Sequence, residues 1–197
     1  SLHDALPISG SVWFAGADVL LADGRTRGRA KRPRQGSEES WEWLTGACLW
    51  LTAELWRETG GFDEDYFLYW EDVDLSRRVV LAGGELRLVD DALAVHDEGG
   101  THRTRGQSRR SKSETYYYFN IRNRMLFATR FLDEEGVRRW RAGVAASARE
   151  VILRGGRKQL LTSVAPWRAY VRGVRDARRI ADGAPARKGD VAAAPSR

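Results

Sequence analysis

The run from Gly60 to Arg78, GGFDEDYFLYWEDVDLSRR, limits most strongly how this chain can fold. It places six carboxylates among large aromatic residues: Asp63, Glu64, Asp65, Glu71, Asp72 and Asp74. Carboxylates crowded beside apolar rings repel one another, and their pKa values rise unless a cation or hydrogen bonds intervene. Two interpretations fit this pattern. Either the acids serve turns and the start of a helix, where the helix dipole favours anions, or they form a functional site.

Turn residues and apolar spacing predict the local structure around this run. A helix is expected over 53–59, with Thr52 as its N-cap and Gly60 as its stop. A second helix is expected over 71–82, because Leu75, Val79 and Ala82 form one apolar stripe at helical spacing. Short strands are predicted within residues 12–15, 41–52, 85–89 and 92–96, and an exposed loop over residues 23–39.

The second half of the chain is predicted to be helical and basic. Helices are expected over 115–131, 134–153 and 159–180, the last broken near Pro166. A long polar loop over 97–113 precedes them. Residues 1–100 hold 10 Lys and Arg against 19 Asp and Glu, whereas residues 101–197 hold 23 against 8. This asymmetry indicates that the second half handles a negatively charged ligand or surface.

Composition excludes several classes of protein. The single cysteine, Cys48, cannot build a disulfide framework or a thiolate zinc site. No run of roughly 18 apolar residues is present, and the chain does not open as a signal peptide does, so we expect a cytoplasmic protein. Residues 1–9 have no periodicity and are expected to lie outside the fold as a disordered leader, and residues 181–197 are expected to form a disordered tail.

An ordered succession of motifs resembles the second half of family 2 glycosyltransferases with the GT-A fold, in the branch of rhamnosyltransferases and galactofuranosyltransferases. The motifs are Gly46-Ala47-Cys48-Leu49, the Gly60 to Arg78 run, Ala82-Gly83-Gly84, Val95-His96 and Arg122-Asn123. The resemblance covers about Gly10 to Phe131. It implies an α/β fold in which residues 10–131 are the acceptor-side half of a GT-A nucleotide-diphospho-sugar transferase domain, and residues 132–180 are basic amphipathic helices that follow it.

The resemblance also implies roles for individual residues. In this family the second acid of the Glu-Asp pair is the general base on the acceptor hydroxyl, a role that falls on Asp72, and Glu71 would orient the acceptor or Asp72. A sugar hydroxyl is a poor nucleophile, so a carboxylate within hydrogen-bond reach assists its attack. The positions expected to bind substrate are Trp70, Gly46, Asp63, Arg122 and Asn123. An aromatic residue beside a helix start is also a common core residue, so that alternative stays open for Trp70.

His96 follows a predicted strand, where the family has a metal-contacting histidine. Taken alone, a histidine at such a position is usually structural. The resemblance favours metal ligation, with Mg²⁺ or Mn²⁺ bridging the diphosphate of the donor.

The expected partners are a nucleotide-sugar donor and a glycan or lipid-linked acceptor, used in the synthesis of a cell-envelope polysaccharide or glycolipid, with inversion at the sugar. The donor-binding strands and Asp-x-Asp motif of the family are absent upstream of Trp41. We therefore expect the chain to be a fragment that is inactive alone.

An alternative function treats residues 101–197 as a basic binding module without catalysis. No nucleic-acid-binding motif is present, and an apolar set accompanies the arginines at helical spacing, so an anionic membrane surface is preferred over nucleic acid. The apolar set is Val137, Trp140, Val144, Val151, Leu160, Val164, Trp167, Val171 and Val174. The two functions are compatible, because peripheral binding at the inner face of the cell membrane would bring a transferase to a lipid-linked acceptor.

Overall fold

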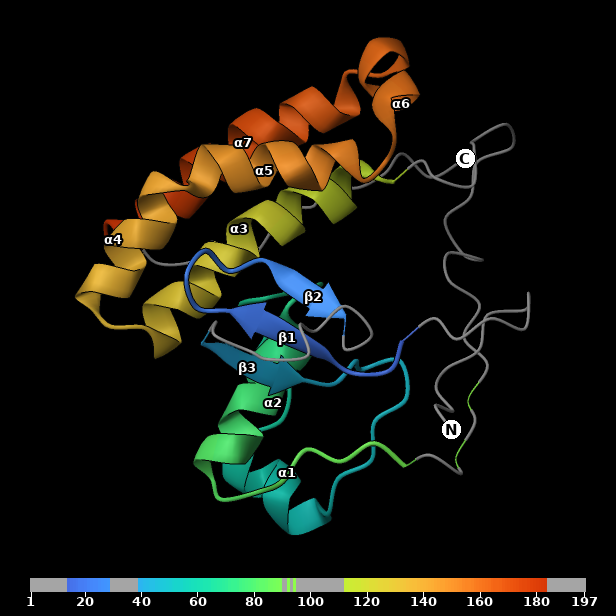
Figure 1. Ribbon diagram of the computed structural model, residues 1–197, viewed down its shortest axis with the longest axis vertical. Coiled ribbons are helices and arrows are strands. Elements are labelled where there is room, and N and C mark those ends of the chain that lie inside the picture. The colour runs from blue at the N-terminus through green and yellow to red at the C-terminus, as the bar shows by residue number, and fades with distance from the viewer. Residues whose placement is uncertain (1–13, 29–38, 90–91, 93, 95–111, 184–197) are drawn as a thin grey trace.

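The computed structural model describes residues 14–28, 39–89, 92, 94 and 112–183, and every structural statement below concerns these residues. Three short strands precede seven helices in this part of the chain (Figure 1). The elements are β1 (Ala17–Leu20), β2 (Thr26–Gly28), β3 (Ser40–Trp43), α1 (Ala53–Thr59), α2 (Glu71–Leu81), α3 (Glu114–Phe131), α4 (Glu134–Ala142), α5 (Val144–Leu153), α6 (Arg157–Thr162) and α7 (Ala165–Ala181). The fold is therefore mixed α/β, with a small sheet and mostly helices, which agrees with the predicted class at this coarse level.

The three strands form an antiparallel sheet in the order β2-β1-β3. Val19 lies opposite Thr26 on one side and Trp41 on the other. All four residues of β1 are buried. The prediction of a strand at 12–15 was wrong for Phe14 and Ala15, since the strand begins after Gly16, whose φ of 78° turns the chain. β2 lies within the predicted loop over 23–39, because pairing with β1 orders a segment that has little strand propensity of its own.

The helices predicted over 53–59, 71–82 and 115–131 are present as α1, α2 and α3. The Thr52 side chain accepts a hydrogen bond from the Leu55 amide, and Gly60 ends α1 with a left-handed φ of 75°. The Ser113 side chain caps α3 in the same way, by accepting from the Tyr116 amide. The helix predicted over 134–153 is two helices, α4 and α5, which meet at Gly143. α6 and α7 confirm the predicted break near Pro166, which lies in the first turn of α7.

Two strand predictions in the first half were wrong in whole or in part. Residues 85–89 form no strand, and within 41–52 the strand ends at Trp43, with its residues only partly buried. The strand predicted over 92–96 lies mostly outside the described residues, which include only 92 and 94 of it. Alternating apolar residues alone do not make a strand, because a strand also needs a neighbouring strand to complete its hydrogen bonds.

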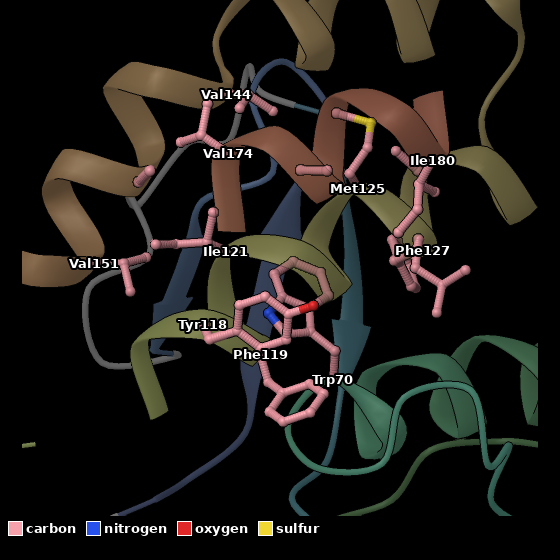
Figure 2. Packing of buried hydrophobic residues seen from close by; sticks show 14 of the residues in the cluster. Trp70, Tyr118, Phe119, Ile121, Met125, Phe127, Val144, Val151, Val174 and Ile180 are labelled. Atoms are coloured by element: carbon pink, nitrogen blue, oxygen red, sulfur yellow. The ribbon is translucent and has the colours of Figure 1, made fainter. Parts of the chain in front are cut away.

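The core joins the sheet to the helices of the second half. α3 lies at the centre and packs most extensively against α7, and also against α5 and α4. Figure 2 shows apolar side chains of α3, α5 and α7 meeting in one cluster, with Trp70 beside them. The Trp140 side chain of α4 is fully buried, and its indole N–H donates to the Leu21 carbonyl at 2.8 Å. Several apolar residues of the basic segment are thus used in the core.

Candidate functional site

Asp72 lies in the first turn of α2, where the helix dipole favours a negative charge. One carboxylate oxygen, Oδ2, accepts a hydrogen bond from the Gly46 amide at 3.1 Å, and the other, Oδ1, accepts from the Val73 amide at 2.9 Å. No ion pair to Asp72 occurs within the described residues, so no guanidinium neutralises it there. Burial raises the pKa of Asp72 above its usual range, and the amides of Gly46 and Val73 oppose that rise. Each carboxylate oxygen thus accepts one amide hydrogen bond, and the side chain is half-buried.

The segment before α1 is attached to the start of α2 by two polar contacts. The Ser76 hydroxyl accepts from the Leu44 amide at 3.1 Å and donates to the Asp72 carbonyl at 2.7 Å. Two residues further along, the Gly46 amide binds Asp72. The structure therefore brings together Gly46 and Asp72, two of the residues predicted from the sequence, although 25 residues separate them. A Cβ on Gly46 would meet Asp72 and Phe62 only at ordinary contact distances of 3.6 Å.

Glu71 lies beside Asp72 with one carboxylate oxygen, Oε2, buried and without a hydrogen-bond partner in the structure. Burial raises its pKa to about 7, and the negative charge of Asp72 adds to the effect. An unpartnered buried carboxylate oxygen is costly, and such groups concentrate at functional sites. Glu71 and Asp72 thus form an acidic pair with elevated pKa values, which we call the Glu71/Asp72 pair.

The chain enters α2 through an unusual backbone. Phe67, Tyr69 and Trp70 have φ angles of 61°, 65° and 74°, the left-handed region that non-glycine residues rarely adopt. Each such residue costs on the order of 1 kcal/mol or more, and such conformations persist where surrounding contacts enforce them.

Asn123 and Arg122 supply those contacts from α3. The Asn123 amide nitrogen donates to the carbonyls of Tyr66, Leu68 and Tyr69 at 2.8, 2.9 and 2.7 Å. The Arg122 guanidinium donates to the Asp65 carbonyl at 2.6 Å and to the Asn123 side-chain oxygen. Both side chains are buried, with exposed fractions of 1% for Arg122 and 0% for Asn123. They hold the loop that leads into the Glu71/Asp72 pair, whereas direct contact with substrate stays a prediction for both.

Three of the other acids in the run, Asp63, Asp65 and Asp74, pair with arginines. Arg130 of α3 pairs with Asp63 at 2.6 Å, with Asp65 at 3.0 Å and with buried Asp74 at 3.4 Å. Asp74 also pairs with Arg78 at 2.5 Å, one helical turn later. The structural interpretation therefore holds for these three acids, because cations relieve their repulsion. A substrate contact by Asp63 stays a prediction. The i, i+4 spacing of Asp74 and Arg78 was visible in the sequence, but nothing local indicated Arg130.

Trp70 lies in the core rather than on the surface. Its exposed fraction is 7%, and its ring centroid is 5.5 Å from that of Phe127 (Figure 2). The alternative weighed from the sequence, a core aromatic at a helix start, describes this placement. Stacking on a sugar face stays a prediction that this placement does not favour.

The predicted metal ligand, His96, lies outside the described residues. In the part of the chain that the structure describes, no group of three or more His, Cys, Asp or Glu side chains could hold a metal ion. These residues thus do not by themselves form the predicted metal site.

Comparisons with known proteins agree with the resemblance. Over 60 residues the chain is 43% identical to the N-acetylglucosaminyl-diphospho-decaprenol L-rhamnosyltransferase of Mycobacterium tuberculosis, a stretch that covers 30% of this chain and 20% of that enzyme. Over 70 residues it is 33% identical to the rhamnosyltransferase WbbL of Escherichia coli K12, covering 34% of this chain and 26% of the relative. The chain is similar to rhamnosyltransferases. The predicted resemblance is therefore confirmed.

The matched stretches span about a fifth to a quarter of these relatives. No model of a known protein family matches the chain. No solved structure matches it either. None of the helices in the described residues combines the length and apolar content that crossing a membrane requires.

Proposed function

We propose that this chain carries the acceptor-activating part of a glycosyltransferase, with Asp72 as general base. The observation that carries the proposal is the placement of Asp72: half-buried at a helix start, held by two amides and paired with no cation among the residues that the structure describes. A base needs a carboxylate that is fixed in position yet still able to take a proton, and a guanidinium partner would suppress that ability. The similarity to two rhamnosyltransferases supports the same reaction class.

In the proposed reaction the acceptor hydroxyl attacks the anomeric carbon of a nucleotide sugar. Asp72 takes the hydroxyl proton as the new C–O bond forms. The bond from the anomeric carbon to the diphosphate breaks at the same time, and its electron pair leaves with the diphosphate. A single displacement of this kind inverts the anomeric centre. Glu71 would orient the acceptor hydroxyl or Asp72, as donor when protonated or as acceptor when ionised.

The wider setting belongs to the same proposal. We infer a GT-A type domain that works in the cytoplasm on cell-envelope glycans, with a glycan or lipid-linked acceptor. The name of the mycobacterial relative contains such a lipid-linked diphosphate sugar. A divalent cation, Mg²⁺ or Mn²⁺ with His96 among its ligands, remains part of the proposal. It would stabilise the charge of the leaving diphosphate. We expect the 197-residue chain alone to show negligible transfer.

The test compares transfer of radiolabelled sugar, from a panel of nucleotide-diphosphate hexoses and deoxyhexoses, into lipid-extractable and glycan acceptors. It is run on the 197-residue chain and on any longer product of its reading frame. In a longer product that transfers sugar, Asp72→Asn should lower turnover by about 10²-fold or more, since it removes the base but keeps the shape. Asp182→Asn, at an exposed aspartate beyond α7, is the matched control and should be near wild type. Full turnover by Asp72→Asn would end the proposal.

A further inference from the structure

We propose that the outer edge formed by α6 and the first half of α7 docks on an anionic lipid surface. This docking edge consists of Leu161, Val164, Trp167 and Val171, with the basic residues that flank them. The proposal concerns residues far in sequence from the Glu71/Asp72 pair and stands independently of the proposed function.

The apolar side chains of the docking edge are exposed. Trp167 and Val171 lie one turn apart on α7, Val164 is the residue before that helix, and Leu161 lies in the last turn of α6, beyond the extended Ser163. The exposed fractions of Leu161, Val164, Trp167 and Val171 are 88%, 68%, 50% and 65%. Isolated exposed apolar residues are ordinary, but four such side chains around one junction between two helices favour contact with another apolar phase.

Internal packing does not account for the docking edge. α7 already buries its opposite face, where Ala169, Gly173 and Ala177 lie against the core. The approach there is close, because a Cβ on Gly173 would lie 2.9 Å from the Ile121 side chain of α3. α7 therefore has two apolar faces, one used by the fold and one facing outward. Figure 1 shows α6 and α7 on the side of the molecule away from α1 and α2.

Trp167 is oriented as an interfacial tryptophan would be. Its indole N–H donates to the Leu160 carbonyl at 2.9 Å, so its polar atom is satisfied within the protein. Half of the side chain is nevertheless exposed. Tryptophan is favoured at the boundary between water and lipid, since it combines a large apolar ring with one polar group.

The charge around the docking edge is strongly positive. Residues 154–180 contain eight Lys or Arg and one acid, Asp176. Arg157, Lys158 and Arg168 are exposed in the same two helices, and Arg168 pairs with Glu114 of α3 at 3.4 Å. Each basic residue near an anionic leaflet contributes on the order of 1 kcal/mol to binding. Apolar and cationic residues in the same two helices match a membrane surface, whereas a nucleic acid would satisfy the charges and leave the aliphatic side chains in water.

The docking edge is held firmly by the rest of the fold. From the start of α6, Gln159 accepts hydrogen bonds from the Tyr117 hydroxyl at 2.6 Å and the Lys112 amide at 3.1 Å. Its own amide group donates to the Lys112 carbonyl at 2.8 Å. α6 is thereby tied to the beginning of α3, so the apolar residues of the docking edge are presented in a fixed arrangement.

Co-sedimentation with lipid vesicles tests the proposal on the 197-residue chain. We expect binding to vesicles of phosphatidylcholine with about 30% phosphatidylglycerol, weaker binding at high salt, and little binding to phosphatidylcholine alone. Trp167→Ser should weaken binding about five-fold or more, from the lost burial of a half-exposed ring. The double variant Arg157→Glu with Lys158→Glu should weaken it about ten-fold or more.

Matched controls separate this surface from general stickiness. Trp50→Ser removes a tryptophan that is 85% exposed elsewhere, and should bind vesicles as wild type does. Urea midpoints for all variants check that they remain folded. The proposal would be overturned if Trp50→Ser weakened vesicle binding as much as Trp167→Ser does. It would also be overturned if the wild type bound no vesicles, or bound neutral and anionic vesicles equally well. A dimer in sedimentation velocity that Trp167→Ser abolishes would overturn it too, since the docking edge would then bind a second copy of the chain.

Discussion

Replacing Asn123 with alanine should destabilise the protein far more than its size suggests. Its side-chain amide donates to three carbonyls of the loop before α2, at 2.7 to 2.9 Å, and it is completely buried. Two N–H groups serve three acceptors, so the loss is about two hydrogen bonds. The Tyr66 carbonyl keeps the Leu68 amide as a donor at 2.7 Å, so the carbonyls of Leu68 and Tyr69 carry the loss. A buried carbonyl that loses its donor costs roughly 1–3 kcal/mol. Without Asn123, nothing replaces the contacts that hold the three left-handed residues of the loop. We therefore expect Asn123→Ala to lower the free energy of unfolding by about 3 kcal/mol in total.

Asn120→Ala is the matched control on the same helix. Asn120 lies one turn earlier in α3, and its amide donates only to the Tyr116 carbonyl within that helix. Alanine also has the higher helix propensity, so this change should cost about 0.5 kcal/mol or less. The contrast between the two variants isolates the loop contacts from the general effect of losing an asparagine.

Urea denaturation followed by tryptophan fluorescence measures both variants, since the chain contains eight tryptophans. With an unchanged m-value, a difference of about 3 kcal/mol lowers the midpoint of Asn123→Ala by roughly 1–3 M relative to the control. If the two variants unfold within about 0.5 kcal/mol of each other, Asn123 does not hold the loop, and the backbone before the Glu71/Asp72 pair must be stabilised by other contacts.

Three further predictions concern the acidic run. The pKa of Glu71 rises from 4.5 to about 7 on folding, so the folded state holds the extra proton between these values and loses stability as pH rises through that window. The full pKa shift corresponds to a change of about 3 kcal/mol in the free energy of unfolding, which partial exposure reduces to about 1–2 kcal/mol. Urea denaturation at pH values from 4 to 8 measures this dependence, and Glu71→Gln should flatten it. Gly46→Pro removes the amide that binds Asp72 and should raise the Asp72 pKa in a carbon NMR titration, whereas Gly46→Ala should not; equal titrations would show that this amide is unimportant. Arg130→Met leaves the acids that pair with Arg130 without a cation, and should lower the free energy of unfolding by about 2–4 kcal/mol in chemical denaturation. Arg138→Met, at an exposed ion pair, is the control and should lower it by about 0.5 kcal/mol. Similar losses in both variants would show that the Arg130 ion pairs contribute no more than a surface pair does.

The sequence by itself determined the elements whose signals are local. α1 begins after Thr52 and ends at Gly60, as predicted, and the apolar stripe with Leu75 and Val79 identified α2. Such signals work because capping and amphipathic spacing depend on residues within one or two turns. The motif succession likewise indicated similarity to rhamnosyltransferases, and it directed attention to Asp72 and Gly46 before their contact was visible.

Only the tertiary structure decided that one distant arginine neutralises several acids of the run. Local spacing showed an arginine partner for Asp74 alone, yet Arg130, more than 50 residues later, pairs with Asp63, Asp65 and Asp74 and not with Asp72. The placement of β2, the interior position of Trp70, and the outward apolar residues on α6 and α7 were decided in the same way. Each of these three placements depends on which distant segment of the chain packs beside it. The local sequence pattern carries little information about such contacts, because burial and strand pairing are set by the complete tertiary structure.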